Sequence, residues 1–397
     1  MKVVFFNRFF LPDASATSQV LSDLALHLAA SGHEVHVVTS RVPGGEAREE
    51  EIGAVSVHRV AHAIPGPHGL ARRALAYAGY YRGARRIAKR MVTPGDVVVL
   101  KTDPPLLSAA IAPIAVERGA RVITWLQDLF PEIAQEYGIV GMRGLLGATL
   151  RRARDRSLER SDAVVVISKG MADRVTSLGC VDRTRLHVIH NWADGRAIVP
   201  VEGAANRLRR DWGLDGKFVV AYSGNLGRVH EFDTMLGAAA LLREQRDVQF
   251  IVIGRGPRLA GVQVRVRRDA LANVRFEPAQ ERRALASSLG VADVHLSILR
   301  PEFEGLVHPS KLYGILAAGR PMIFIGSVTG ETARILRETG SGVAIPTGDA
   351  RALADAIVRM KDDARGRTAM GASARKAFEA AYDMPIALAK WREVLGV

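Results

Sequence analysis

The strongest constraint on the fold of this chain is a regular alternation of short apolar runs with helix-like segments. Residues 18–33 show the helical type, because Leu21, Leu24 and Leu28 share one face and Gly32 follows as a stop signal. The apolar runs, many rich in β-branched residues, lie at 3–6, 35–40, 97–100, 121–126, 163–168, 219–223, 250–254, 274–276, 294–298, 322–326 and 343–345. Continuous apolar strands separated by helices predict an α/β fold with parallel sheets covered on both faces.

The alternation predicts two halves of this kind. A chain of 397 residues is too long for one ordinary core, and the rhythm pauses once, at 191–217, where Gly, Pro and charged residues gather. We expect an N-terminal domain at 1–195 and a C-terminal domain at 196–378, each a doubly wound parallel sheet, facing a central cleft. The final segment, 379–397, contains a lone helix that we expect to pack back on the N-terminal domain. Ligands of such sheets bind at the carboxyl ends of the strands.

Composition excludes several classes of protein. With 48% hydrophobic and 24% charged residues the chain has a globular composition. The apolar stretch at 106–116 falls short of the roughly 20 residues that cross a bilayer, and the opening stretch, cut by Asn7 and Arg8, predicts a buried strand rather than a signal peptide. Cys180 is the single cysteine, which excludes a disulfide within the chain. A net charge of +14 suits an acidic partner, whether nucleic acid, anionic lipid or a phosphorylated substrate.

The first candidate site is the stretch YSGNLGRVHEFDTML at 222–236. Gly224 and Gly227 form a turn between a strand and a helix, and Arg228 and His230 follow it. A glycine-rich turn before a helix presents backbone N–H groups to an anion, and an arginine adds charge-assisted hydrogen bonds. The stretch predicts an anion site, and the alternative is an ordinary strand-to-helix turn.

The second candidate site is EGLVHPSKLYGILAAGRP at 304–321. A loop from Glu304 to Val307 leads into a helix that we expect to begin near Ser310, so that the first amide groups of the helix point back at the loop. Lys311 lies in the first turn, where a cation opposes the helix dipole. This placement predicts that Lys311 faces an anion, and the alternative is a lysine that points to solvent.

Two segments of the N-terminal half also follow strands and carry acidic residues. KTDPPL at 101–106 contains Asp103, and WLQDLFPE at 125–132 contains Asp128 and Glu132. We expect these groups at the carboxyl edge of the first sheet. For Asp128 the alternative is a structural cap on the next turn.

The segment 69–91 predicts an amphipathic helix with seven basic residues and no acid. Its basic side carries Arg72, Arg82, Arg85, Arg86, Lys89 and Arg90, and its other side carries Leu70, Tyr77, Tyr80, Tyr81, Ile87 and Met91. A basic and aromatic helix is typical of contact with anionic lipid. The alternative is a solvated basic face on a helix that packs on its own domain through the tyrosines.

Several motifs, in order along nearly the whole chain, make it resemble the retaining glycosyltransferases of family 4. They are GHEVHVVTS at 32–40, SDAVVVISKGM at 161–171, VIHNWAD at 188–194, IGRGP at 253–257, NVRFEP at 273–278, ADVHLSI at 292–298, AAGRP at 317–321 and SGVAIPTGD at 341–349. The wording PSK and YGILAAGRP looks like the subgroup found with bacterial O-antigen, capsule and exopolysaccharide synthesis.

The resemblance implies two Rossmann-like domains in the GT-B arrangement. It also implies sugar transfer with retained configuration, without a metal or another cofactor, from a nucleotide-sugar donor that we expect to be a UDP-sugar rather than a GDP-sugar. The implied donor contacts are Gly224, Asn225, Arg228, His230, Gly254, Arg255, Glu302, Glu304, Gly305, Leu306, Val307, Ser310 and Lys311. Glu304 and Asp128 are the expected catalytic residues, and Asp103 and Glu132 lie on the acceptor side.

The chain departs from the family pattern at three places. Counted back from Gly319, the position of the family's second glutamate is Gly314, so a carboxylate that binds ribose is absent there. The family's usual lysine after the glycine-rich turn falls at about His230. Gln127 stands where many relatives have histidine.

The expected function is therefore glycosyl transfer to a glycan or undecaprenyl-linked acceptor in cell-surface polysaccharide synthesis. We expect the protein in the cytoplasm or peripherally on the inner face of the membrane, with Arg82, Arg85, Arg86 and Lys89 as the membrane contact. The alternatives are a sugar-nucleotide 2-epimerase of the same architecture, a sugar-binding relative without activity, and a basic nucleic-acid-binding protein. Nucleic acid is not an expected partner, because no nucleic-acid-binding signature accompanies the positive charge.

Overall fold

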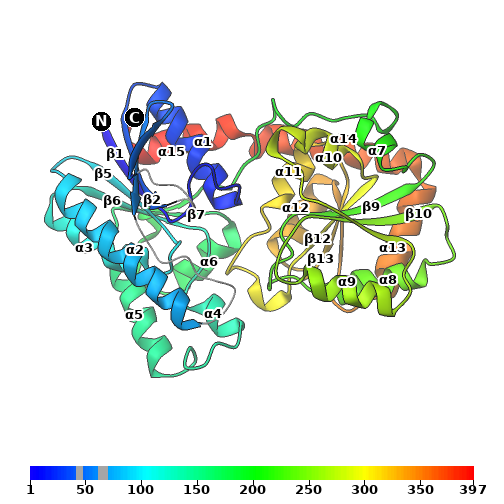
Figure 1. Ribbon diagram of the computed structural model, residues 1–397, viewed down its shortest axis with the longest axis horizontal. Coiled ribbons are helices and arrows are strands. Elements are labelled where there is room, and N and C mark those ends of the chain that lie inside the picture. The colour runs from blue at the N-terminus through cyan, green and yellow to red at the C-terminus, as the bar shows by residue number, and fades with distance from the viewer. Residues whose placement is uncertain (42–47, 61–69) are drawn as a thin grey trace. The chain divides into compact units, whose positions relative to one another are not determined.

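The computed structural model describes residues 1–41, 48–60 and 70–397, which form two compact units. Unit 1 comprises Met1–His190, Gly305–Val307 and Leu388–Val397, and unit 2 comprises Asn191–Glu304 and His308–Ala387. Figure 1 shows one sheet in each unit, with helices around it. The predicted class, two doubly wound parallel sheets, is confirmed. Within the described ranges every helix is too short or too polar to span a bilayer.

Unit 1 contains an eight-stranded sheet with the order β3-β4-β2-β1-β5-β6-β7-β8. Its strands are β1 (Lys2–Phe6), β2 (Glu34–Ser40), β3 (Glu49–Ile52), β4 (Val55–Val60), β5 (Val97–Lys101), β6 (Arg121–Leu126), β7 (Ala163–Val166) and β8 (Leu186–Val188). All neighbours are parallel except β3 and β4. The sequence patterns missed β3, β4 and β8, because β3 is rich in glutamate, β4 alternates polar with apolar residues and β8 is very short.

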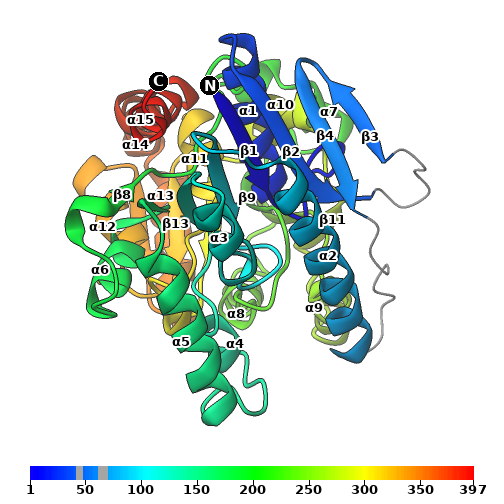
Figure 2. The ribbon, with the colours of Figure 1, turned by 90° about the vertical axis from the view of Figure 1, so that its left-hand side faces the viewer.

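The helices of unit 1 pack on both faces of this sheet. They are α1 (Ala16–Ala30), α2 (Leu70–Met91), α3 (Leu107–Glu117), α4 (Glu132–Glu136), α5 (Leu145–Glu159), α6 (Lys169–Ser177) and the 3₁₀ turn η1 (Arg183–Arg185). Figure 2 shows α2, α3 and α5 in front of the strands. Val4, Phe6 and Leu100 form a core with Tyr80 of α2 and Ile111 of α3. Each strand therefore buries alternate residues beneath these two helices.

The last helix, α15 (Met384–Leu395), ends in unit 1. Trp391 is fully buried, and its ring centroid lies 4.5 Å from that of Trp125 in β6. The Arg121 guanidinium donates to the carbonyl of Leu395 at 3.1 Å. Two large aromatic side chains therefore fix the end of the chain to the sheet of unit 1.

Unit 2 contains a six-stranded parallel sheet with the order β11-β10-β9-β12-β13-β14. Its strands are β9 (Phe218–Ser223), β10 (Val248–Ile253), β11 (Val274–Glu277), β12 (Val294–Ile298), β13 (Met322–Ile325) and β14 (Gly342–Ile345). Its helices are α7 (Arg207–Asp211), α8 (Asp233–Leu241), α9 (Leu259–Arg268), α10 (Leu285–Gly290), α11 (Lys311–Ala317), α12 (Glu331–Thr339), α13 (Ala350–Asp362), α14 (Ala364–Ala381), with 3₁₀ turns η2 (Gly203–Ala205), η3 (Arg282–Ala284) and η4 (Pro301–Phe303). Strand order reverses between β9 and β12, where doubly wound sheets bind ligands at their carboxyl edge.

The core of unit 2 follows the alternation of β9. Val220 and Tyr222 face α8, α9 and α13, which Figure 1 shows together along one side of the sheet. Val219 and Ala221 face the other way, onto a cluster that includes Leu214. Both faces of the strand are buried, which explains its continuous apolar sequence.

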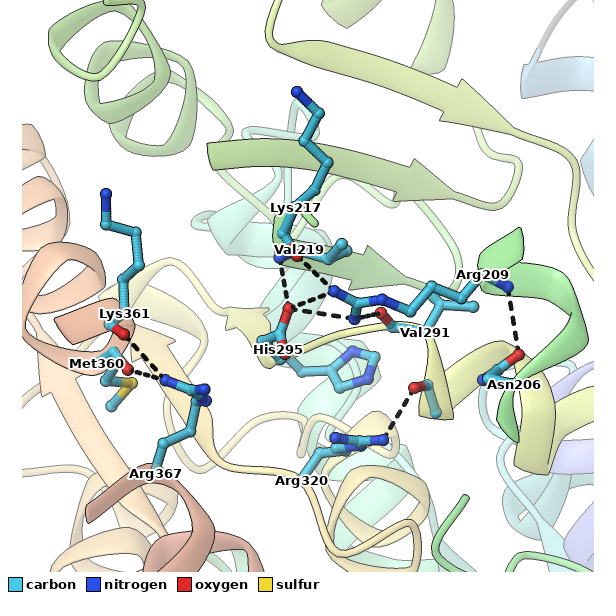
Figure 3. A network of polar contacts seen from close by, with 12 residues as sticks. Asn206, Arg209, Lys217, Val219, Val291, His295, Arg320, Met360, Lys361 and Arg367 are labelled. Atoms are coloured by element: carbon cyan, nitrogen blue, oxygen red, sulfur yellow. Dashed lines mark hydrogen bonds and ion pairs between the residues drawn. The ribbon is translucent and has the colours of Figure 1, made fainter. Parts of the chain in front are cut away.

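Arginines hold the amino edge of the unit 2 sheet. Two nitrogens of Arg209 bind a carboxylate oxygen of Asp293 at 3.2 Å, and that carboxylate also accepts the N–H of Val219 at 2.7 Å. Arg320 donates to the carbonyl of Gly290 at 2.9 Å. Figure 3 shows this network around the first residues of β9. The positive charges at this edge are therefore used to pair a carboxylate and to cap carbonyl groups.

Replacing Trp391 tests the attachment of the last helix. Because Trp391 is fully buried against Trp125, we expect Trp391→Ala to lower the free energy of unfolding by about 3–5 kcal/mol. Urea denaturation followed by circular dichroism measures this. Lys390 is exposed, so Lys390→Ala should change stability by less than about 0.5 kcal/mol. Equal effects of the two substitutions would contradict the packing described here.

Candidate active site

Three loops meet at the carboxyl edge of the unit 2 sheet. Residues 224–230 follow β9, residues 254–258 follow β10 and residues 299–310 follow β12. Two of these segments contain the predicted anion motifs, and the third, after β10, contains the IGRGP motif. The fold therefore brings together segments that lie far apart in the sequence.

Backbone hydrogen bonds join the three loops. The Leu226 N–H donates to the carbonyl of Arg255 at 2.8 Å, and the Arg258 N–H donates to the carbonyl of Leu226 at 3.1 Å. The Arg300 N–H donates to the carbonyl of Val229 at 2.9 Å. These bonds fix the backbones of the three loops relative to one another.

Gly254 is the point where two of the loops approach most closely. Its φ is +149°, and a methyl group on its Cα would overlap the carbonyl oxygen of Gly224. Gly224 itself has φ +133° and donates its N–H to the carbonyl of Ile253 at 2.9 Å. The contact therefore requires glycine at 254 for both conformation and space.

Lys311 of α11 lies beside the first loop. Its Nζ donates to the Tyr222 hydroxyl at 2.7 Å and lies 4.0 Å from the centre of the Tyr222 ring. A Cβ on Gly224 would lie 3.4 Å from the Cε of Lys311, so the lysine adjoins the glycine turn rather than projecting away from it. The Tyr222 hydroxyl in turn donates to the carbonyl of Asn225 at 2.8 Å. Lys311 belongs to the second predicted anion motif, and its side chain lies beside the glycine turn of the first.

Burial lowers the pKa of Lys311 to about 7. Tyr222 provides a hydroxyl oxygen and a ring face, and no ion pair to Lys311 is present among the described residues. An ammonium group in such surroundings gains from a bound anion, which would favour its charged form.

The exposed face of this loop cluster is polar and basic. Asn225, Arg228, Arg255 and Ser310 are all exposed. Neither arginine has an ion-pair partner within the part of the chain that the structure describes. Ser310 precedes α11, which begins at Lys311, and its side chain caps no amide of the helix.

His230 is buried within the first loop. Its Nδ1 donates to the carbonyl of Ile298 at 2.7 Å, which leaves Nε2 as an acceptor in the neutral ring. Burial, with the nearby charge of Lys311, lowers the pKa of His230 to about 2. His230 is therefore neutral at physiological pH and links the first loop to the end of β12.

Glu304 lies at the amino end of α12. One carboxylate oxygen accepts the N–H of Glu331, the first residue of that helix, at 2.8 Å. Burial raises the pKa of Glu304. The other oxygen, Oε2, is buried and accepts no hydrogen bond within the described residues. Glu302, the other predicted carboxylate, pairs with Arg300.

The segment Gly305–Val307 groups with unit 1, although the residues on either side of it belong to unit 2. The Leu306 carbonyl accepts the N–H of Leu129 at 2.9 Å, and Gly305 has φ +73°.

Gly314, at the position of the expected second carboxylate, faces Leu289, whose Cδ1 would lie 3.4 Å from a Cβ. The surroundings of position 314 are thus apolar.

The carboxyl edge of the unit 1 sheet carries Asp103 and Asp128. Arg8 binds Asp103 through Nε at 2.7 Å and stacks on Tyr77, with 5.1 Å from its guanidinium carbon to the ring centre. Burial raises the pKa of Asp128 to about 6, although a hydrogen bond from Thr102 partly opposes this rise. Asp128 is thus neighboured by Thr102 and by a second carboxylate, and its burial favours the protonated form.

Glu132, the third acidic candidate, is held in an ion pair. Both of its oxygens bind the buried Arg154, at 2.9 and 3.0 Å. Arg154 also binds Asp155 at 2.6 Å. This pairing gives Glu132 a structural partner, whereas Asp128 forms no ion pair with another residue in the part of the chain that the structure describes.

Comparison with known proteins identifies the family. The model of "Glycosyltransferase Family 4" matches residues 17–196, and the model of "Glycosyl transferases group 1" matches residues 217–363. The chain belongs to the family 4 glycosyltransferases. It is 27% identical to WcaI of Escherichia coli K12, named as a colanic acid biosynthesis glycosyl transferase, over 87% of this chain and 88% of that protein.

Solved structures of glycosyltransferases of the GT-B type share this fold. Sucrose-phosphate synthase from Thermosynechococcus elongatus superposes with a TM-score of 0.81 and 17% identity over 100% of this chain and 98% of that one. HepE from Anabaena, in complex with UDP-glucose, gives a TM-score of 0.74 and 14% identity over 100% and 99% of the two chains. At these identities the likeness concerns the fold.

The α2 helix of this glycosyltransferase is amphipathic, as predicted, but its aromatic side is used internally. Tyr80 is fully buried and donates to the carbonyl of Val38 at 2.8 Å, and Tyr81 donates to the carbonyl of Pro105. The predicted basic residues Arg82, Arg85, Arg86 and Lys89 are exposed. Arg72 lies in the helix, but its side chain is outside the described ones. The tyrosines therefore follow the alternative interpretation, that of packing on their own unit.

Sequence reasoning missed three residues of these sites. The sequence pattern identifies Tyr222 only as part of a strand and Arg8 only as a break in an apolar run, and it gives Lys101 no role. Lys101 is buried, donates to the carbonyl of Thr17 at 3.0 Å and lies 3.7 Å from the centre of the Trp125 ring. A lysine that ends the apolar run VVVLK was the available signal.

No cluster of three or more His, Cys, Asp or Glu side chains within the described ranges is arranged to hold a metal ion.

Adding one methyl group at Gly254 tests the loop arrangement. Because a Cβ would overlap the Gly224 carbonyl, we expect Gly254→Ala to separate the two loops and weaken nucleotide-sugar binding about tenfold or more, measured by calorimetry. Gly261 in α9 has open space around its Cα, so Gly261→Ala is the matched control and should bind normally. Equal binding by both variants would contradict the role of this contact.

The pKa of Lys311 makes a prediction about pH. Since its pKa is lowered to about 7, the charged form that attracts an anion is complete below this pH and is lost as pH rises through it. The diphosphate of a nucleotide-sugar does not titrate near neutrality, so the affinity of the protein for such a donor should fall from pH 6 to pH 8.5. Lys311→Met should bind weakly with a flat pH profile. A wild-type profile that is flat or rises would show that Lys311 does not act by its charge.

Proposed function

We propose that this glycosyltransferase transfers a sugar from a nucleotide-sugar donor to a glycan or undecaprenyl-linked acceptor during synthesis of bacterial cell-surface polysaccharide. The observation that carries the proposal is the ammonium group of Lys311 beside the glycine turn at Gly224, with no carboxylate paired to it among the described residues. The name of the relative WcaI supports the polysaccharide role. The UDP-glucose in the HepE complex supports a nucleotide-sugar as the donor, and we propose UDP as its nucleotide.

The donor diphosphate would bind at the loop cluster of unit 2. Departure of the nucleoside diphosphate builds negative charge on its oxygens, and fixed positive groups lower the barrier to that step. Lys311 and Arg228 supply the charge, and the amide groups of the turn after Gly224 supply hydrogen bonds. With these groups in place, we propose that the reaction proceeds without a metal ion.

Glu304 would hold the donor sugar. Its buried Oε2 has no partner within the described residues, and a hydroxyl of the sugar would supply one. Its other oxygen is fixed by the first amide of α12, so the carboxylate is oriented before the donor binds. Fixed contacts on one face of the sugar suit a reaction in which the acceptor enters on the face of the departing phosphate, with retained configuration.

Asp128 and Asp103 would serve the acceptor. Arg8 fixes Asp103, and the raised pKa of Asp128 gives it a greater affinity for a proton than an exposed carboxylate has. Asp128 is therefore the proposed group for receiving the proton of the acceptor hydroxyl. We further propose a location on the cytoplasmic side of the membrane, with the exposed arginines of α2 near its anionic surface.

A donor panel tests the proposed function. We expect UDP-sugars to raise the melting temperature more than GDP- or ADP-sugars, with an unchanged result in EDTA. The best donor should release UDP only when a lipid-linked or glycan acceptor is added. Lys311→Ala should weaken donor binding roughly ten- to a hundredfold, since a hydrogen bond to a charged group is lost.

Other outcomes of the same panel would count against this proposal. Conversion of the donor sugar without an acceptor would indicate an epimerase. No stabilisation by any sugar nucleotide, or normal donor affinity of Lys311→Ala, would remove the assignment of the loop cluster as the donor site.

A further inference from the structure

The connection between α4 and α5 in unit 1 exposes three apolar side chains close together in sequence. Val140 is 92% exposed, Leu145 is 90% exposed and Leu146 is 51% exposed. We refer to these three residues as the apolar tip. Figures 1 and 2 both show α4 and the neighbouring end of α5 at the lower end of unit 1. Single exposed leucines are common, whereas a local group of them marks an interaction site.

The apolar tip is a fixed feature of the backbone. Met142, between Val140 and Leu145, is buried, and its carbonyl accepts a hydrogen bond from Arg151 at 3.4 Å. The Gly147 N–H donates to the carbonyl of Gly141 at 3.2 Å. A methyl group on Gly147 would overlap the Met142 carbonyl, so the connection is folded tightly on the first turn of α5. The fold buries Met142 and leaves its apolar neighbours outside.

A stripe of arginines continues from the apolar tip along α5. Leu145, Thr149, Arg152 and Arg156 are all exposed, and their spacing of four, three and four residues places them on one face of the helix. At 1.5 Å per residue, Arg152 lies about 10 Å and Arg156 about 16 Å from Leu145 along the axis. Arg143, beside the tip, is exposed as well.

The acidic groups of this region are paired, half-buried or distant. Asp155 and Glu132 bind the buried Arg154, and Glu136 of α4 is half-buried. Glu159 is exposed but ends α5, at the end opposite the apolar tip. The surface near the tip is therefore apolar at its end and positive behind it.

We propose that the apolar tip inserts into the surface of an anionic lipid bilayer, with the arginines of α5 at the lipid phosphates. Apolar side chains followed by cations within about 10 Å match the order of a bilayer surface, where hydrocarbon lies beneath the charged headgroups. A stable protein interface takes about 800 Å² from each partner, which is more than three side chains offer. Insertion into lipid needs only a small apolar area.

This inference changes the part that α2 plays at the membrane. Its tyrosines are engaged within unit 1, and among its described side chains, from Ala76 onward, α2 exposes charged groups rather than large apolar ones. The apolar tip supplies that missing apolar contact from a different element. Lipid binding needs no sugar donor, so its failure would be distinct from failure of the proposed function.

Co-sedimentation of the full-length protein with lipid vesicles tests the inference. We expect binding to vesicles containing phosphatidylglycerol and little binding to phosphatidylcholine alone. The double substitution Leu145→Ser with Leu146→Ser should weaken binding about tenfold or more, because two inserted side chains are lost. Leu241→Ser is the matched control, since Leu241 is 50% exposed on unit 2, and it should bind like the wild type. Thermal unfolding should be unchanged in both variants.

The role of charge and the depth of insertion are separate measurements. Arg152→Ala with Arg156→Ala should weaken binding at low salt and have little effect at high salt. The chain has four tryptophans of its own. In Leu145→Trp, brominated lipid should therefore quench the additional emission, measured as the difference between the variant and the wild type. The inference is overturned by absent vesicle binding, by normal binding of the double serine variant, or by unquenched emission. It is also overturned if the serine variant instead abolishes self-association in the absence of lipid.

Discussion

The candidate donor site depends on the close approach of Gly254 to the carbonyl of Gly224, a contact that no larger residue permits. β9 and β10 are neighbours in the sheet, so the loops that leave them would diverge if a side chain separated their first residues. Because they touch, the Leu226 amide reaches the carbonyl of Arg255 and the first loop is held against the second. The position of Asn225, and through its carbonyl that of the Tyr222 hydroxyl, follows from this contact.

Lys311 then lies in surroundings that favour its neutral form, and a bound anion reverses that preference. Its pKa is lowered by burial beside Tyr222, so the free protein holds the ammonium group at an energetic cost. A donor diphosphate would recover this cost on binding, because Coulomb attraction is stronger where water is excluded. The same argument explains why His230, which lies near Lys311, is kept neutral by burial and by this charge. Lys311 is thus a buried cation beside the glycine turn, and His230 next to it stays neutral.

The periodicity of the sequence was sufficient for the fold class and for bringing the two glycine-containing motifs to one edge of a sheet. It could not find β3, because EEEI acquires its strand partner only from β4. It placed Lys311 in the first turn of a helix but could not choose between solvent and an anion, since that depends on Tyr222, which is distant in sequence. It also left open whether the tyrosines of α2 contact a lipid surface or their own domain, and the structure shows that Tyr80 donates to the Val38 carbonyl of a strand of the same unit. Periodicity identifies the apolar side of a helix but not what covers it.

The arginines of unit 2 show why net charge alone was a weak guide to function. At the amino edge of its sheet, Arg209 is paired with Asp293 and Arg320 with a carbonyl group, so these cations are neutralised or shared within the fold. At the carboxyl edge, Arg228 and Arg255 are exposed without such pairing among the described residues. The two edges differ in satisfied hydrogen bonds rather than in the number of positive side chains. The phosphate oxygens of a nucleotide-sugar would supply acceptors for Arg228 and Arg255 at the carboxyl edge. At the amino edge the acceptors for Arg209 and Arg320 are already supplied by the protein.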